Sequence, residues 1–169
     1  DMADVKEEKA QAEAWASFWR GKMLPILPET LAELAQQARR VERVLPGQIA
    51  EIVLRDPLLA VQVLRFINQR ERTSLAADIV SIEKAVMLMG VQPFFDRFSR
   101  LPSIDTVLPT DSPSYQRLLA LRLDTELLVR LLSDLAEQRY DARPEEIIMA
   151  ALLAELNEML VLLAPALDV

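Results

Sequence analysis

The stretch "RDPLLAVQVLRFINQ" (residues 55–69) decides the fold class of this chain. Asp56 is typical of a helix N-cap, because its short carboxylate can accept hydrogen bonds from the first backbone N–H groups of a helix. Pro57 suits the first helical position, where no N–H is needed. Apolar side chains then recur at helical spacing, at Leu59, Val63, Phe66 and Ile67. The stretch therefore predicts an amphipathic helix that begins at residue 57.

Similar start and stop signals recur along the chain. They predict further helices over residues 4–20, 29–43, 49–53, 81–90 and 111–140, with a last one from residue 144. The run "SIDTVLP" (residues 103–109) would be an isolated strand, and one strand cannot form a sheet. We expect an all-α, single-domain bundle of about seven or eight helices. A helical extension (residues 1–21) would precede the domain (residues 22–169).

The composition excludes several kinds of chemistry. The chain has no histidine and no cysteine, which removes imidazole bases, thiol nucleophiles and disulfides. A net charge of -7 argues against nucleic-acid binding, which needs a basic surface. Phosphate-binding glycine loops and nucleophile elbows are also missing from the sequence. We expect no enzyme and no cofactor.

The apolar stretch "AALLAELNEMLVLLA" (residues 150–164) is the strongest candidate for a membrane segment. It carries Glu155, Asn157 and Glu158, and charged groups inside a bilayer are costly. The N-terminus is charged and lacks the apolar core of a signal peptide. We therefore expect a soluble, cytoplasmic protein without membrane contact.

Three segments, taken in order, resemble the HDOD domain, the HD-related output domain of bacterial signalling proteins. They read "LPILPETLAELAQQ" (24–37), "PGQIAEIVLRDPLLAVQVLRFIN" (46–68) and "IVSIEKAVMLMGVQ" (79–92). The resemblance covers roughly residues 22–164 and implies an HD-domain-like helical bundle. It departs from the family at Gln69, where a small residue is usual. Many members also continue past the position of Val169, so we expect the C-terminus of the domain to be truncated here.

The resemblance also implies a relation to HD phosphohydrolases, which carry their metal-binding His-Asp pair in a leucine-rich helix. Aligned on the leucines, Ala154 stands at the histidine and Glu155 at the aspartate, and Asn157 replaces a glycine. A metal site of that kind needs several converging ligands. An oxygen-only Mg²⁺ site remains an alternative, formed by Asp124, Glu126, Glu155 and Glu158. A residual phosphohydrolase is the least favoured hypothesis, and no metal is expected.

Two arginine clusters are candidate contacts for an anion or an acidic partner, because guanidinium groups match phosphate and carboxylate geometry. Their members are Arg39, Arg40 and Arg43, and Arg65, Arg70 and Arg72. The alternative is that they form solvated faces neutralised by nearby glutamates. An aromatic stripe at Trp15, Phe18 and Trp19 has two interpretations: packing on its own domain, or an anchor for a partner or homodimer.

As the resemblance implies, the first hypothesis is a non-catalytic regulatory module of bacterial signal transduction. It would act through contacts with a protein partner or a fused signalling domain. The second hypothesis is a degenerate HD-type pocket that binds a nucleotide or cyclic nucleotide through arginines without hydrolysing it.

Overall fold

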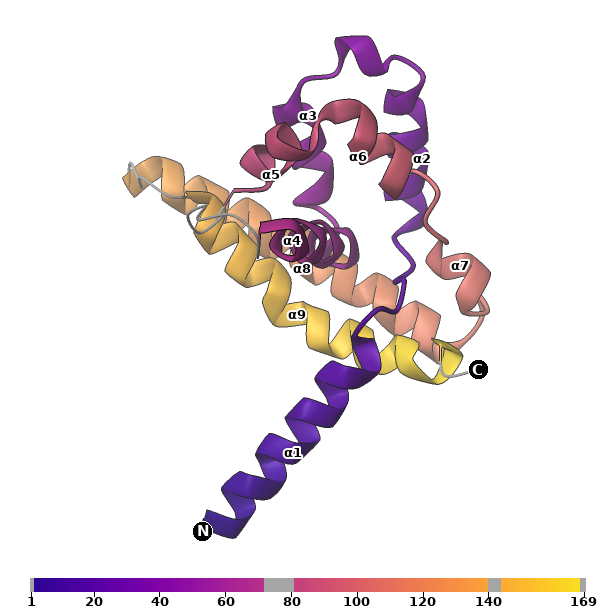
Figure 1. Ribbon diagram of the computed structural model, residues 1–169, viewed down its shortest axis with the longest axis vertical. Coiled ribbons are helices and arrows are strands. Elements are labelled where there is room, and N and C mark those ends of the chain that lie inside the picture. The colour runs from indigo at the N-terminus through magenta and orange to yellow at the C-terminus, as the bar shows by residue number, and fades with distance from the viewer. Residues whose placement is uncertain (1, 72–80, 140–143, 168–169) are drawn as a thin grey trace.

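The computed structural model describes residues 2–71, 81–139 and 144–167, with side chains omitted for residues 2–5, 70–71 and 144. These residues form nine α-helices and one 3₁₀ turn (Figure 1), which confirms the expected all-α class. The helices are α1 (Met2–Trp19), α2 (Pro28–Ala38), α3 (Pro46–Val53), α4 (Pro57–Glu71), α5 (Ile82–Met89), α6 (Val91–Phe98), α7 (Ile104–Val107), α8 (Pro113–Arg139) and α9 (Pro144–Leu167). The count exceeds the expected seven or eight because residues 91–98 form a separate helix after Gly90 and residues 104–107 form another short one.

The cap predicted for α4 is confirmed. The Asp56 Oδ1 atom accepts hydrogen bonds from the backbone N–H groups of Leu58 (2.9 Å) and Leu59 (3.2 Å). Pro57 follows at the first helical position, where its missing N–H has no cost. The local sequence therefore determines where this helix begins.

Two further helices begin at hydroxyl caps. Ser81 Oγ accepts from Lys84 N (3.4 Å) at the start of α5, and Ser112 Oγ accepts from Tyr115 N (3.2 Å) at the start of α8. Gly90 ends α5 with a φ of 91°, a conformation that residues with a Cβ rarely adopt.

The predicted helix over residues 29–43 is wrong in its last third, residues 39–43. Helix α2 ends at Ala38, and a separate 3₁₀ turn covers Val41–Arg43. Arg40 between them has a φ of -131°, which interrupts the helical path. Helix α3 begins at Pro46 rather than at residue 49, because proline suits the first turn of a helix.

Helix α4 lies at the centre of the domain, where Figure 1 shows it nearly end-on. Its Leu59, Val63 and Ile67 side chains face a core cluster shared with α2, α3, α5, α6 and the first half of α9. Its Leu58 faces a second cluster, shared with the end of α1 and with α7, α8 and α9. Because apolar side chains cover both of its sides, α4 joins two layers of helices into one core.

Helices α8 and α9 form a long antiparallel pair beneath α4 (Figure 1). The aromatic end of α1 packs against this layer, while the rest of α1 projects away from the domain. By length and composition alone, residues Glu145–Leu167 of α9 could cross a membrane. In this fold α9 contributes Leu152, Met159 and Leu163 to the core, and core helices of soluble proteins pass the same test.

Candidate functional site

Helix α8 carries apolar side chains on two opposite faces. The inner face packs in the core through Leu118, Leu121 and Ala136. The outer face presents four leucines at four-residue spacing, with exposed fractions of 58, 59, 52 and 49%: Leu123, Leu127, Leu131 and Leu135. We call these four residues the leucine face. A surface helix normally has one apolar stripe, which faces the core, so the second, exposed stripe is a candidate binding surface.

The outer side of α9 contains the positions that the resemblance aligns with the HD pair, Ala154 and Glu155. Ala154 and Asn157 are exposed, and Val161 follows four residues later on the same side of the helix. Glu155 is half-buried. The Ala154 methyl group therefore faces solvent.

Two of the four carboxylates considered for Mg²⁺, Glu126 and Glu158, form ion pairs with arginines. Arg117 of α8 donates from Nε to Glu158 Oε1 of α9 at 2.6 Å, and this bond lowers the pKa of Glu158 and raises the pKa of Arg117. Glu126 contacts Arg122 and Arg130 of its own helix. Over the described part of the chain, no three acidic side chains gather in a way that could hold a metal ion. The oxygen-only site is therefore not assembled.

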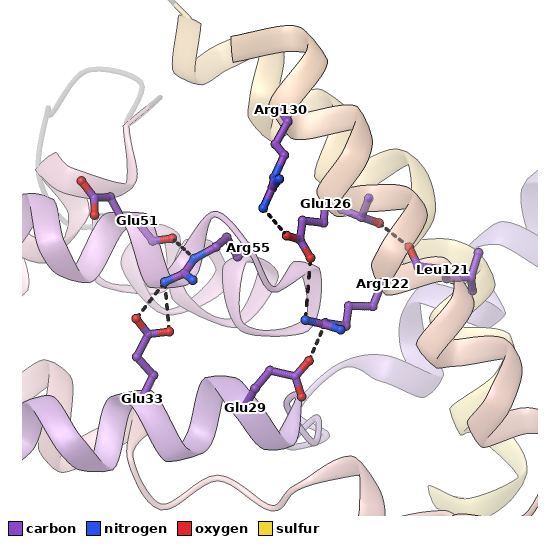
Figure 2. Close-up of polar contacts among 9 residues, drawn as sticks. Glu29, Glu33, Glu51, Arg55, Leu121, Arg122, Glu126 and Arg130 are labelled. Atoms are coloured by element: carbon purple, nitrogen blue, oxygen red, sulfur yellow. Dashed lines mark hydrogen bonds and ion pairs between the residues drawn. The ribbon is translucent and has the colours of Figure 1, made fainter. Parts of the chain in front are cut away.

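Figure 2 shows how exposed ion pairs connect α2 to its neighbours. Arg55, just after α3, makes two bonds to the Glu33 carboxylate, at 2.8 and 2.9 Å. Arg122 of α8 bonds to Glu29, and Glu126 links Arg122 to Arg130. We call this set of three arginines and three glutamates the surface ladder. The glutamates of the surface ladder neutralise its arginines, which would otherwise be candidate contacts for an anion.

The structure separates the arginines predicted to contact an anion. Arg39, Arg40 and Arg43 are exposed around the end of α2 and the 3₁₀ turn. Arg65 is half-buried on α4 and lines a cavity of about 320 Å³. The Arg70 side chain and the whole of Arg72 lie outside the described residues. Among the described candidates, Arg65 is the one that lines this cavity.

The same cavity contains an arginine that the sequence analysis missed. Arg97 of α6 stacks over the Phe66 ring of α4, with its guanidinium carbon 4.0 Å from the ring centroid. Met23, Gln69 and Phe98 complete much of the wall. No sequence signal marks Arg97, because residues 65 and 97 meet only through the packing of α4 against its neighbours.

The aromatic stripe packs largely on its own domain. Trp19 is 8% exposed within the second core cluster, so it cannot serve as an exposed partner anchor, and that interpretation is corrected. Trp15 and Phe18 are half-buried and stack with ring centroids 6.0 Å apart. They border an open apolar groove, together with Ala164 and Pro165 of α9.

Comparison with protein families identifies the fold. The family model described as the HDOD domain matches residues 24–166. The chain belongs to the HDOD family. Searches of curated proteins and of solved structures give no match. The HDOD match begins after α1 and covers α2 to α9, which agrees with the resemblance carried by Asp56-Pro57 and Gly90.

Proposed function

We propose that this HDOD domain is a non-catalytic regulatory module of cytoplasmic bacterial signalling, and that it binds a protein partner or a fused signalling domain. The observation that carries the proposal is the leucine face of α8. Leucine side chains exposed by about half leave apolar area that a docked partner would remove from water.

The geometry of the leucine face suits a helical partner. Side chains four residues apart lie along one side of a helix and can enter the groove of another helix. Asp124, Arg130 and Asp134 are exposed beside the leucines and supply the polar rim that protein interfaces usually have. Full burial of one leucine contributes roughly 1.5–3 kcal/mol, so two or three central leucines would dominate the affinity.

Two features support a role without catalysis. By the resemblance, Ala154 stands where the metal-binding histidine would be, and the chain contains no histidine at all. Glu158 is neutralised by Arg117, so it is poorly placed to act as a general base.

The leucine face is tested by a charge substitution with a matched control. Leu127→Lys with Leu131→Lys places two charges on it, whereas Ala32→Lys with Gln36→Lys places two charges on an exposed side of α2. Affinity capture with quantitative mass spectrometry is then run on each variant. We expect at least one protein to be lost about tenfold or more with the α8 variant alone, since burying a lysine charge in an apolar interface is unfavourable. An identical set of captured proteins for wild type and the α8 variant would refute the proposal.

The absence of catalysis is tested separately. A generic phosphodiester, bis(p-nitrophenyl) phosphate, is incubated with the protein and Mn²⁺. We expect hydrolysis no faster than in buffer. Turnover that disappears with Glu155→Ala would show that the α9 position has kept an enzymatic role.

A further inference from the structure

The cavity beside Arg65 is the feature that the proposed function leaves unused. It lies between the segment after α1, the middle of α4, and the end of α6. At about 320 Å³ it falls at the lower end of the range for small-molecule sites, roughly 300–1,000 Å³. A small ligand is therefore the appropriate size of occupant.

The charge of the cavity wall differs from that of the chain. Among the described residues that line it there are two arginines and no aspartate or glutamate, although the protein carries a net charge of -7. The arginines of the surface ladder each contact a carboxylate. Within the described ranges, neither Arg65 nor Arg97 makes an ion pair. Their positive charge is therefore available to an anion that enters the cavity.

Arg65 is held in a fixed orientation. Its Nη1 donates to the carbonyl of Trp19 at 3.2 Å, and its Nη2 donates to the carbonyl of Lys22 at 2.8 Å. Guanidinium has five N–H groups, so these two bonds leave other donors for a ligand. A cation anchored by backbone carbonyls loses little side-chain entropy when it binds an anion.

Arg97 supplies a second donor group beside an apolar wall. Its guanidinium carbon lies over the Phe66 ring, 4.0 Å from the centroid, and a guanidinium over a ring can still donate from the N–H groups at its edge. Met23, which is 61% exposed, provides apolar surface nearby, whereas Phe98 and Leu101 of the same wall are buried in the core. Gln62 also lines the cavity, but its amide is already bonded to the backbone of Leu24 and Leu58. The exposed amide of Gln69 is the neutral polar group on the wall that can meet a ligand.

We propose that this cavity binds a nucleoside phosphate, with the phosphate on the guanidinium groups of Arg65 and Arg97. The nucleoside ring lies against the exposed Met23 side chain, within reach of the Gln69 amide. Guanidinium pairs match phosphate oxygens geometrically, and an exposed apolar side chain on the wall of a cavity offers a surface against which a base can be buried. The site is distinct from Ala154 and Glu155, which do not line the cavity. It is also independent of the leucine face, so either proposal can fail alone.

Isothermal titration calorimetry tests the site with four probes: AMP, GMP, inorganic phosphate and adenosine. We expect AMP or GMP to bind at least about tenfold more tightly than inorganic phosphate or adenosine, because only a nucleotide uses both parts of the cavity. Absence of heat from both nucleotides at millimolar concentration would overturn the proposal. Equal affinity for AMP and inorganic phosphate would overturn the ring subsite.

Variants then localise the binding. Arg97→Met keeps an apolar stem and removes the charge, and we expect nucleotide affinity to fall about tenfold or more, the effect of one charge-assisted hydrogen bond. Arg97→Lys should recover only part of that loss, because an ammonium lacks the planar fork. The control is Arg100→Met, an exposed arginine outside the cavity lining, which should change affinity less than about twofold. Equal losses for Arg97→Met and Arg100→Met would show nonspecific attraction and refute the site.

Discussion

Helix α2 is held to the rest of the domain in two contrasting ways. Below its start, the fully buried Asp56 accepts a hydrogen bond from Leu27 N at 2.9 Å and another from the Thr30 hydroxyl, while also capping α4. Along its outer edge, Glu29 and Glu33 enter the surface ladder. The buried carboxylate of Asp56 and several exposed ion pairs therefore both join α2 to the rest of the domain.

The difference between them lies in solvent access rather than in number. The side chains of the ladder are between 31% and 74% exposed, so water and salt screen their attraction. The donors around Asp56 are buried, and a donor left without its acceptor there has no water to replace it. The number of ion pairs is therefore a poor measure of how strongly α2 is held to the domain.

Four substitutions test this comparison of buried and exposed polar contacts, from the largest expected effect to the smallest.

Asp56→Ala should have the largest effect on stability. It removes the N-cap of α4 and leaves the N–H of Leu27 buried without an acceptor. We expect the free energy of unfolding to fall by about 3 kcal/mol. Urea denaturation measures this change, with exposed Asp134→Ala as the control. A loss smaller than about 1 kcal/mol would mean that the surface ladder, and not Asp56, mainly holds α2 to the domain.

The buried Asp56 should also make the stability of the protein depend on pH. Burial raises the pKa of Asp56 above its ordinary 3.8, although hydrogen bonds from Leu27, Thr30, Leu59 and Leu58 oppose this rise. The folded protein therefore keeps the proton at a pH where the unfolded chain has released it. The stabilisation from Asp56 is complete below about 3.8 and is lost as pH rises through the raised pKa of the folded state.

Asp56→Asn removes this titration and provides the reference. The free energy of unfolding of wild type minus that of Asp56→Asn should decrease as pH rises above about 4, by up to about 1.4 kcal/mol per pH unit inside the titration window. Urea denaturation of both proteins across a pH series measures the difference. An increase with pH would show instead that the hydrogen bonds outweigh burial and favour the carboxylate.

Arg65→Met should have an intermediate effect. Arg65 ties the segment after α1 to α4 by donating to the carbonyls of Trp19 and Lys22, and it is half-buried. We expect a loss of about 1–2 kcal/mol in the free energy of unfolding, because two charged hydrogen bonds are removed from a partly solvated site. Thermal and urea denaturation measure it. A variant as stable as wild type would show that the apolar packing of Trp19 alone holds α1.

Arg122→Met should have the smallest effect. It removes the link from α8 to Glu29 of α2 and leaves the Glu126–Arg130 pair in place. We expect a loss of at most about 1 kcal/mol at low salt, and close to none at about 1 M salt. The measurement is urea denaturation at both salt concentrations. A larger loss that persists at high salt would make the ladder, rather than Asp56, the principal support of α2.

Local signals predicted much of the fold. Asp56, Ser81 and Gly90 act on backbone groups within about one helical turn, so their effects can be read from neighbouring residues. The end of α2 was mispredicted because the hydrophobic pattern continues to Val41, past the point where the backbone leaves the helix. The hydrogen bond from Leu27 N to Asp56 joins residues that are 29 positions apart in the sequence, so no local pattern predicts it.

The candidate site was less predictable than the fold. The sequence indicates that α8 is rich in leucine, but which leucines face the core depends on how α8 packs against α9. Likewise, Arg65 was a candidate among six arginines, and Arg97 was not considered. Their convergence with Phe66 on one cavity requires α4 and α6 to be placed together.

The sequence alone determined an all-helical HDOD domain without histidine or cysteine chemistry, because composition and helix caps depend only on the residues present and their neighbours. The tertiary structure decided which apolar face of α8 is left exposed, that Trp19 is buried, and that Arg65 and Arg97 share a cavity. These outcomes depend on contacts between segments far apart in the chain. Such contacts are set by how helices pack, which local periodicity does not specify.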